Sequence, residues 1–321
     1  MPLNVKNRRK RGIRIAVTVL SGLLPVLLGF AILYMQAERT LQQSTRLTAE
    51  EAVHQFELMF DNTAEAAREL LPLAGQRCND VKLALREQVT RRPFVRSTNL
   101  VWDDSIYCSS LFGDYQEQID AGDYNQGQLL LMKGNPVTPD SALLVYRLSD
   151  GQRGALSALD GYHLSNVLRL IDRKTLLVLQ VGPNWLSADG RFHDGALPLF
   201  AVAQNELASS RYAFTVAAGF PEGETWRYMK SEYPPLFSLL MFFGVVSGSI
   251  GHVLQKRAMS PRHEMQRAME AAEFIPYFQP VVHGDSKQWS GCEVLMRWNH
   301  PKEGLVRPDL FIPFAEYSGL I

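Results

Sequence analysis

The sequence has no excess of either charge. Its 33 lysine and arginine residues equal its 33 aspartate and glutamate residues, so the formal net charge at pH 7 is zero. This balance gives no support for a nucleic-acid polymer as a partner. The length of 321 residues suits about two domains. The apolar residues are spread unevenly, and two stretches hold an unusual share of them.

Charged residues are absent from these two stretches. The first, Ile15–Met35, has 21 residues without a charge, and the second is Leu236–Leu254. At ~1.5 Å per residue in a helix, the first spans roughly 30 Å, which is the thickness of the hydrocarbon core of a bilayer. Neither stretch has the polar face of a soluble helix. We therefore predict two transmembrane helices.

Each stretch has an alternative interpretation. The alternative for the first is a cleaved signal peptide, but its apolar run is longer than the usual h-region, and no A-x-A-like cleavage site follows at Tyr34–Thr40. The alternative for the second is a buried core helix. Its length and its flanks, Pro234–Pro235 before and Lys256–Arg257 after, favour a membrane span.

Lysine and arginine are concentrated before the first stretch and after the second, which is the cytoplasmic pattern of the positive-inside rule. Both termini are therefore predicted to be cytoplasmic, and the segment between the spans is predicted to lie outside the inner face of the membrane, which is the periplasm if the organism is Gram-negative. The predicted organisation is a basic cytoplasmic N-terminus at 1–14, transmembrane helices at 15–35 and 236–254, a periplasmic domain at 36–235, a cytoplasmic connecting helix at 255–273 and a further cytoplasmic domain at 274–321.

The external segment is predicted to be an α+β domain. Helical patterns at 38–71 and 79–91 precede a series of strand-like runs. By analogy this order is compatible with PAS-like or Cache-like domains, and the segment has no evident small-ligand signature. The polar and aromatic residues within Trp102–Tyr107 are interpreted as packing and turn residues. Strands are expected at 99–107, 128–132, 143–148, 175–181, 199–203 and 212–220.

The three cysteines fit the predicted topology. Cys78 and Cys108 lie in the external segment, and Cys292 lies in the cytoplasmic tail. A Cys78–Cys108 disulfide is permitted in an oxidising compartment. It would close a loop of about 30 residues and contribute roughly 3–4 kcal/mol to stability. Cys108 also begins a Cys-Ser-Ser tripeptide directly after a strand-like segment.

This layout resembles the CSS-motif sensor domain of bacterial membrane phosphodiesterases. The resemblance rests on the Cys-Ser-Ser tripeptide, a second external cysteine, the two flanking spans and the tail described next. It implies a periplasmic disulfide between Cys78 and Cys108 whose redox state, set by periplasmic thiol-disulfide oxidoreductases, controls a cytoplasmic enzyme. The alternative is a bridge that only stabilises the fold. A homodimer is expected by analogy with other membrane sensors.

The cytoplasmic tail contains five ordered sequence blocks that resemble the opening of the EAL domain. The family pattern is Y-x-Q-P, E-A-L-x-R-W-x-H-P, G-x-V-x-P, F-I-P-x-A-E and G-L-I. Val294 stands where the family has alanine, which is a mild change. The matching blocks are Y-F-Q-P-V-V at 277–282, E-V-L-M-R-W-N-H-P at 293–301, G-L-V-R-P at 304–308, F-I-P-F-A-E at 311–316 and G-L-I at 319–321.

The residues of the tail also make chemical sense without the family. Strand-like segments at 278–282 and 289–298, with a turn around Gly284-Asp285 between them, precede a helical segment at 309–318. Strand-helix units of this kind build a (β/α)8 barrel, and we expect about two of its eight βα units here. Glu293 is a carboxylate in an otherwise apolar strand, so it needs a cation or a partner. Arg297 could bind an anionic phosphate through the fork of N–H donors of its guanidinium. The alternative is a structural ion pair between Glu293 and Arg297.

The EAL resemblance implies roles for four residues. Glu293 is implied as a catalytic metal ligand, Gln279 and Arg297 as contacts to the substrate, and Leu295 as part of the substrate pocket. The implied cofactor is Mg²⁺ or Mn²⁺, and the implied activity is that of a cyclic-guanylate-specific phosphodiesterase, which opens cyclic di-GMP to the linear dinucleotide pGpG.

Other residues of the tail are interpreted as structural. Cys292 is expected in the core on the face of the strand opposite Glu293, His300 in a capping or packing role, and Glu316 in fold or dimer contacts. A complete barrel takes about 250 residues, so we expect this chain alone to be inactive and the full-length protein to be an enzyme. Two alternatives stay open: a non-catalytic membrane redox or ligand sensor, and an EAL domain that binds cyclic di-GMP without hydrolysis.

Overall fold

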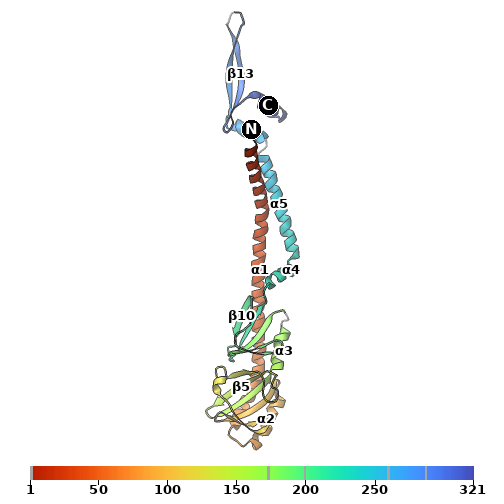
Figure 1. Ribbon diagram of the computed structural model, residues 1–321, viewed down its shortest axis with the longest axis vertical. Coiled ribbons are helices and arrows are strands. Elements are labelled where there is room, and N and C mark those ends of the chain that lie inside the picture. Colours follow the sequence, from red (N-terminus) through yellow and green to blue (C-terminus); the bar gives the residue numbers. More distant parts are fainter. Residues whose placement is uncertain (1–2, 172–173, 199, 259–260, 286–287) are drawn as a thin grey trace. The chain divides into compact units, whose positions relative to one another are not determined.

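The computed structural model describes residues 3–171, 174–198, 200–258, 261–285 and 288–321. The chain divides into two compact units. Residues 32–234 form the first, which we call the sensor unit, and residues 1–31 with 235–321 form the second (Figure 1). The sensor unit therefore corresponds closely to the external segment that the sequence predicts.

The helices of the sensor unit begin with the long helix α1. Val53, Phe56 and Phe60 recur on α1 at the three- and four-residue spacing of one helical face, and all three are buried. The helical patterns predicted at 38–71 and 79–91 are confirmed. The helical elements are α1 (Leu3–Leu70), η1 (Leu71–Leu73), α2 (Cys78–Arg91), η2 (Ala121–Asp123), α3 (Gly161–Ile171) and α4 (Glu224–Glu232).

An antiparallel sheet with the strand order β3-β2-β1-β6-β5-β4 forms one part of the sensor unit. The single strand predicted at 99–107 is wrong, because Asp103 and Asp104 adopt positive φ angles of 50° and 53° and turn the chain between β1 and β2. Their interpretation as turn residues is confirmed. The strands are β1 (Val95–Trp102), β2 (Ser105–Ser109), β3 (Gly113–Gln118), β4 (Leu129–Met132), β5 (Leu143–Asp150) and β6 (Arg153–Asp160).

A second antiparallel sheet has the order β10-β11-β7-β8-β9. The predictions at 175–181 and 212–220 overlap β7 and β11. The run predicted at 199–203 begins outside the described residues, and the strand there starts later, at Val202. The strands are β7 (Leu176–Val181), β8 (Asn184–Ser187), β9 (Phe192–Asp194), β10 (Val202–Ala208) and β11 (Thr215–Phe220).

Aromatic side chains join α1 to the five-stranded sheet. The ring of Phe60 lies 5.1 Å from that of Phe214 and 5.6 Å from that of Tyr212, both edge to face. Phe56 contacts Phe214 at 6.0 Å. Phe56, Phe60 and Phe214 are all buried in the main core. Edge-to-face rings add about 0.5–1.5 kcal/mol beyond their area burial, so this cluster fixes how the helix lies on the sheet.

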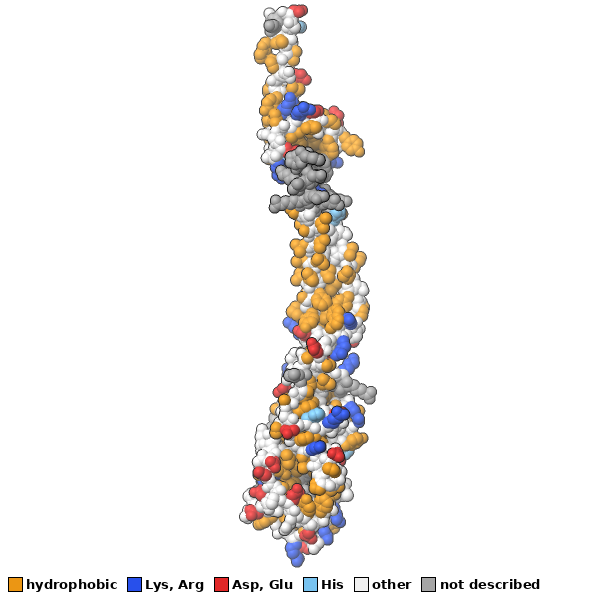
Figure 2. All heavy atoms as spheres, viewed as in Figure 1, with side chains coloured by type: hydrophobic (Ala, Val, Ile, Leu, Met, Phe, Trp, Pro, Cys, Tyr) orange, Lys and Arg blue, Asp and Glu red, His pale blue; other side chains and the backbone are white. Residues whose placement is uncertain are grey.

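The second unit contains two helices that are long and apolar enough to cross a membrane, the N-terminal part of α1 and helix α5 (Pro234–Ala258). Their apolar side chains are exposed, as the orange surface in Figure 2 shows. The two helices approach closely at glycines, since a Cβ on Gly22 would lie 3.0 Å from the Gly244 carbonyl oxygen. The Ser247 hydroxyl donates to the Ser21 carbonyl at 2.8 Å.

The tail forms an antiparallel sheet of β12, β13 and β14. The turn predicted near Gly284 and the helix predicted at 309–318 are confirmed. The expectation of two βα units is wrong for the described residues, because β12 is followed directly by β13 and the two strands pair as an antiparallel hairpin. The elements are α6 (Pro261–Glu270), β12 (Phe274–Val282), β13 (Trp289–His300), β14 (Gly304–Val306) and α7 (Pro308–Tyr317).

Candidate functional site

Four residues predicted from the sequence share one face of the β12–β13 hairpin. Gln279 lies directly opposite Glu293 in the antiparallel register. Because successive side chains alternate between the two faces of a strand, Leu295 and Arg297 lie on the same face of β13 as Glu293. The register therefore brings together residues that are 14 positions apart in the sequence, since Gln279 and Glu293 are direct partners.

Glu293 and Arg297 do not pair with each other. Glu293 is exposed, and within the described residues no ion pair joins its carboxylate to Arg297. The Arg297 guanidinium is half-buried and donates one hydrogen bond, to the Met296 carbonyl at 3.2 Å. The structural ion pair considered from the sequence is therefore not formed, and both charged groups are accessible to a ligand.

A divalent-cation site needs more ligands than Glu293 alone. Mg²⁺ and Mn²⁺ prefer oxygen ligands, and a carboxylate on a strand face fits one coordination position. Over the parts of the chain that the structure describes, no group of three or more His, Cys, Asp or Glu side chains is arranged to hold a metal ion. The residues present therefore fit one corner of such a site without completing it.

The sequence predicts structural roles for two residues of β13 outside this face, His300 and Cys292. His300 is buried, and its Nδ1 accepts hydrogen bonds from the backbone of Lys302 and Glu303 at 3.2 and 3.1 Å, so its capping and packing role is confirmed. Cys292 is exposed, so its assignment to the core is wrong. It does lie on the face opposite Glu293, but α7 contacts that face at the far end of the strand, where Trp298 packs against Phe311.

In the sensor unit, the Cys78–Cys108 disulfide is present. It links the first residue of α2 to strand β2, with a Cα–Cα distance of 5.2 Å, and both cysteines are buried. The two cysteines are 30 positions apart in the sequence. It therefore fixes the N-terminal end of α2 against the six-stranded sheet.

The two serines of the Cys-Ser-Ser tripeptide are buried and hydrogen-bonded. The Ser110 hydroxyl accepts from the Thr98 amide of β1 at 3.0 Å, and the Ser109 hydroxyl accepts from the Leu111 amide at 3.2 Å. The Ser110 carbonyl accepts from the guanidinium of Arg86, in α2, at 3.2 Å. The tripeptide thus holds β2, β1 and the middle of α2 together.

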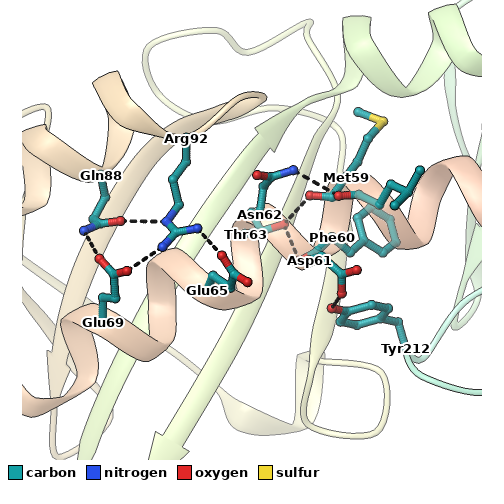
Figure 3. A network of polar contacts seen from close by, with 11 residues as sticks. Met59, Phe60, Asp61, Asn62, Thr63, Glu65, Glu69, Gln88, Arg92 and Tyr212 are labelled. Atoms are coloured by element: carbon teal, nitrogen blue, oxygen red, sulfur yellow. Dashed lines mark hydrogen bonds and ion pairs between the residues drawn. The ribbon is translucent and has the colours of Figure 1, made fainter.

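The C-terminal end of α2 is joined to α1 by a polar group of Glu65, Glu69, Gln88 and Arg92, which we call the Arg92 cluster (Figure 3). The guanidinium of Arg92 pairs with Glu65 and, at 2.5 Å, with Glu69 of α1. The Gln88 amide donates to Glu69 at 2.6 Å. Helix α2 is therefore attached to the sheet by a disulfide at one end and to α1 by charged hydrogen bonds at the other.

A second polar contact ties α1 to the five-stranded sheet. The carboxylate of Asp61 accepts from the Tyr212 hydroxyl at 2.6 Å (Figure 3). It also accepts from the Arg211 guanidinium at 3.0 Å. Burial, the largest single effect, raises the pKa of Asp61, but the hydrogen bonds from Arg211 and Tyr212 outweigh it and leave that pKa below its ordinary value. Asp61 is therefore held as an anion.

The sequence interpretation missed a cavity of about 250 Å³ on the six-stranded sheet. Ser97, Tyr115, Glu117, Asp123 and Tyr124 are among its lining residues. The signal that would have pointed to it is the alternation of aromatic and acidic residues between β2 and β4, in a stretch otherwise read as connecting chain.

Comparison with known proteins agrees with this architecture. The CSS motif domain associated with EAL matches residues 41–233, and the EAL domain matches residues 262–321. The chain is 27% identical to the probable cyclic di-GMP phosphodiesterase PdeD of Escherichia coli strain K12. The alignment covers 96% of this chain and 59% of PdeD. PdeG of the same strain, also named a probable cyclic di-GMP phosphodiesterase, is 23% identical over 91% of the chain, with 58% of PdeG covered.

The tail is more similar to known proteins than the rest of the chain. The cyclic di-GMP phosphodiesterase PdeL of Escherichia coli strain K12 is 54% identical over 54 residues, which are 17% of this chain and 15% of PdeL. The chain spans less than two thirds of the length of these curated relatives. With a sensor unit that matches over most of its length and the paired cysteines in place, the chain belongs to the family of CSS-motif domains associated with EAL.

Proposed function

We propose that this chain is the sensor and the opening of the catalytic domain of an inner-membrane cyclic di-GMP phosphodiesterase. The observation that carries the proposal is the shared face of Gln279, Glu293, Leu295 and Arg297 on the β12–β13 hairpin, within the residues that match the EAL domain. The relatives named as phosphodiesterases of cyclic di-GMP support the same substrate.

In the proposed site, the Glu293 carboxylate would be one of the ligands that hold Mg²⁺ or Mn²⁺. When bound, the metal ion supplies Lewis-acid stabilisation of the charge that develops on the phosphodiester. Arg297 binds a phosphate oxygen of cyclic di-GMP through its planar fork of N–H donors. Gln279, opposite Glu293, contacts the dinucleotide, and Leu295 between the two charged residues shapes the pocket. The product is pGpG.

We also propose that the periplasmic disulfide controls this activity. Helix α2 is fixed to β2 by the Cys78–Cys108 bridge and to α1 by the Arg92 cluster. Helix α1 continues without a break from the sensor unit into its apolar segment. Reduction releases the N-terminal end of α2, and this change reaches α1 through the Arg92 cluster. The bridged form is the restrained one.

The proposed topology follows the sequence prediction. Residues 15–35 and 236–254 cross the inner membrane, residues 36–235 lie in the periplasm, and residues 255–273 connect the second span to the catalytic domain. The bridge then lies in the same compartment as the periplasmic thiol-disulfide oxidoreductases that would set its redox state. The protein acts as a homodimer.

The test uses a protein whose EAL domain has the length found in these relatives, purified in a membrane mimetic. We expect conversion of cyclic di-GMP to pGpG with Mg²⁺ or Mn²⁺, no turnover with EDTA, and faster turnover after reduction. Tight binding of cyclic di-GMP without turnover would favour a binding domain, and neither binding nor turnover would favour a non-catalytic sensor. Equal turnover in both redox states would leave the bridge a purely structural element.

A further inference from the structure

The cavity on the six-stranded sheet lies on the face away from the disulfide. Its floor is apolar and comes from β4, β5 and β6, with Leu130, Val145 and Leu156 among the lining residues. Its cover is the segment from the end of β2 to η2. At about 250 Å³ it is slightly smaller than the pockets that take drug-sized molecules. It therefore suits a small organic ligand.

Buried polar side chains line this cavity without a partner. Ser97 and Tyr124 are each only 6% exposed, and both line the cavity. Among the described residues neither hydroxyl group makes a hydrogen bond, and neither is fully enclosed, because the enclosed hydroxyl without a partner in that part of the chain is that of Ser157. Burial raises the pKa of Tyr124 to about 12, against a smaller opposing effect of Arg147. The phenol is therefore neutral, with a free lone pair for a donor.

All the charged residues that line the cavity are acidic. Glu117, Asp120 and Asp123 line the cavity at its exposed side, whereas no lysine, arginine or histidine does so. Arg147 lies outside the cavity against the ring of Tyr124, at 5.8 Å, and its guanidinium is 3.7 Å from Asp104. A ligand in the cavity therefore meets carboxylates and no cation.

Aromatic rings complete the lining. Phe112 and Tyr115 stack with centroids 4.9 Å apart, and both line the cavity together with Tyr124. Ring faces attract an ammonium group, more strongly the further it is desolvated. Carboxylates attract the same group and repel anions.

We infer that this cavity is a binding site for a small organic cation, an amine or diamine of a few carbon atoms, in which ammonium groups meet the Glu117–Asp123 rim and the rings of Tyr115 and Tyr124. The inference goes beyond the proposed phosphodiesterase function and does not depend on it. It assigns a chemical signal to the sensor unit in addition to the redox state of its disulfide.

The test measures binding of 1,4-diaminobutane to the whole 321-residue chain in detergent by isothermal titration calorimetry. Butanedioate, of similar length and opposite charge, is the comparison ligand. We expect saturable binding of the diamine, none of the dicarboxylate, and weaker diamine binding as the salt concentration rises. The double variant Glu117→Gln, Asp123→Asn should bind about tenfold more weakly.

Asp114→Asn is the matched control for the substitution at Glu117, because Asp114 lies in the same strand, β3, and also loses one negative charge but does not line the cavity. It should bind the diamine like the unchanged chain. Tyr124→Phe, which keeps the ring and removes the hydroxyl, should also weaken binding. Absence of saturable diamine binding at millimolar concentration, preferential binding of butanedioate, or an equal loss in Asp114→Asn would each overturn the inference. Calorimetric unfolding of every variant separates loss of binding from loss of the fold.

Discussion

The sensor unit and the tail place their apolar residues differently. In the sensor unit, Phe56, Phe60 and Leu100 are completely buried between α1 and the sheets. In the tail, Phe278 is 68% exposed and Trp289 is 78% exposed, and the small core there is centred on Phe311. The sensor unit is thus stabilised by its own contacts, whereas the tail presents its distinctive residues on an open hairpin. Substitutions in the first should change stability, and substitutions in the second should change chemistry.

The largest effect is expected on the open face. This prediction concerns the protein whose EAL domain is as long as that of the relatives. In it, Glu293→Gln should reduce hydrolysis of cyclic di-GMP by more than about a hundredfold, because the variant loses a charged metal ligand. The unfolding temperature should not change, since Glu293 is exposed. The readout is pGpG formation, with Glu303→Gln, an exposed glutamate between the sequence blocks, as control. Unchanged turnover in Glu293→Gln would show that Glu293 has no role in the chemistry.

Truncation of a core side chain should instead change the stability of the fold. Phe60→Ala in the sensor unit should lower the free energy of unfolding by about 3–5 kcal/mol, since it removes a buried ring and leaves a cavity. Phe278→Ala in the tail should change it by less than about 0.5 kcal/mol. Chemical denaturation of the whole chain measures both. Similar losses from the two substitutions would remove the contrast between the units.

Loss of the disulfide should lower the free energy of unfolding slightly less than Phe60→Ala does. Replacing Cys78 and Cys108 by alanine together should lower the free energy of unfolding by about 3 kcal/mol, because the bridge closes a loop of 30 positions. Reduction of the unchanged chain should produce a similar loss, and reductant should have no further effect on the double variant. A stability that is insensitive to both changes would mean that the bridge adds nothing to the fold.

The Arg92 cluster offers a smaller test with a close control. Arg92→Gln should lower the free energy of unfolding by about 1–2 kcal/mol, because the side chain is only 19% exposed and serves two carboxylates of α1. Arg91→Gln removes the neighbouring guanidinium, which is 69% exposed and pairs only within α2, and should cost less than about 0.5 kcal/mol. If the cluster transmits redox control, Arg92→Gln should also make turnover independent of reductant, while Arg91→Gln should not.

The smallest effect concerns pH. The pKa of Asp61 is lowered in the folded state, so its contribution to stability is present above its unfolded pKa and is lost as the pH falls through the folded pKa. Between about pH 5 and pH 2 the unchanged chain should therefore lose more stability than Asp61→Asn, by less than about 1 kcal/mol. Parallel curves for the two proteins would show that the contact with Arg211 and Tyr212 is not worth measurable stability.

Much of the local structure could be predicted from the sequence. The helices at 38–71 and 79–91 and most strands of the sensor unit were found because their patterns are local. The break at Asp103 and Asp104 was missed, since apolar residues on both sides made one strand as plausible as two. Both strands of the tail hairpin and the turn near Gly284 were predicted, but their antiparallel pairing was not, because the tail was interpreted as βα units of a barrel.

Residue types and their spacing were enough to predict the family, the two apolar helices and the cysteine pair, and to select Gln279, Glu293, Leu295 and Arg297 as candidate site residues. Only the tertiary structure decided that Gln279 faces Glu293, that Cys292 is exposed, and that α2 connects the disulfide to α1 through Arg92. It also decided that acidic and aromatic residues of a connecting segment enclose a cavity. These depend on strand register and on contacts between distant segments, which no local pattern encodes.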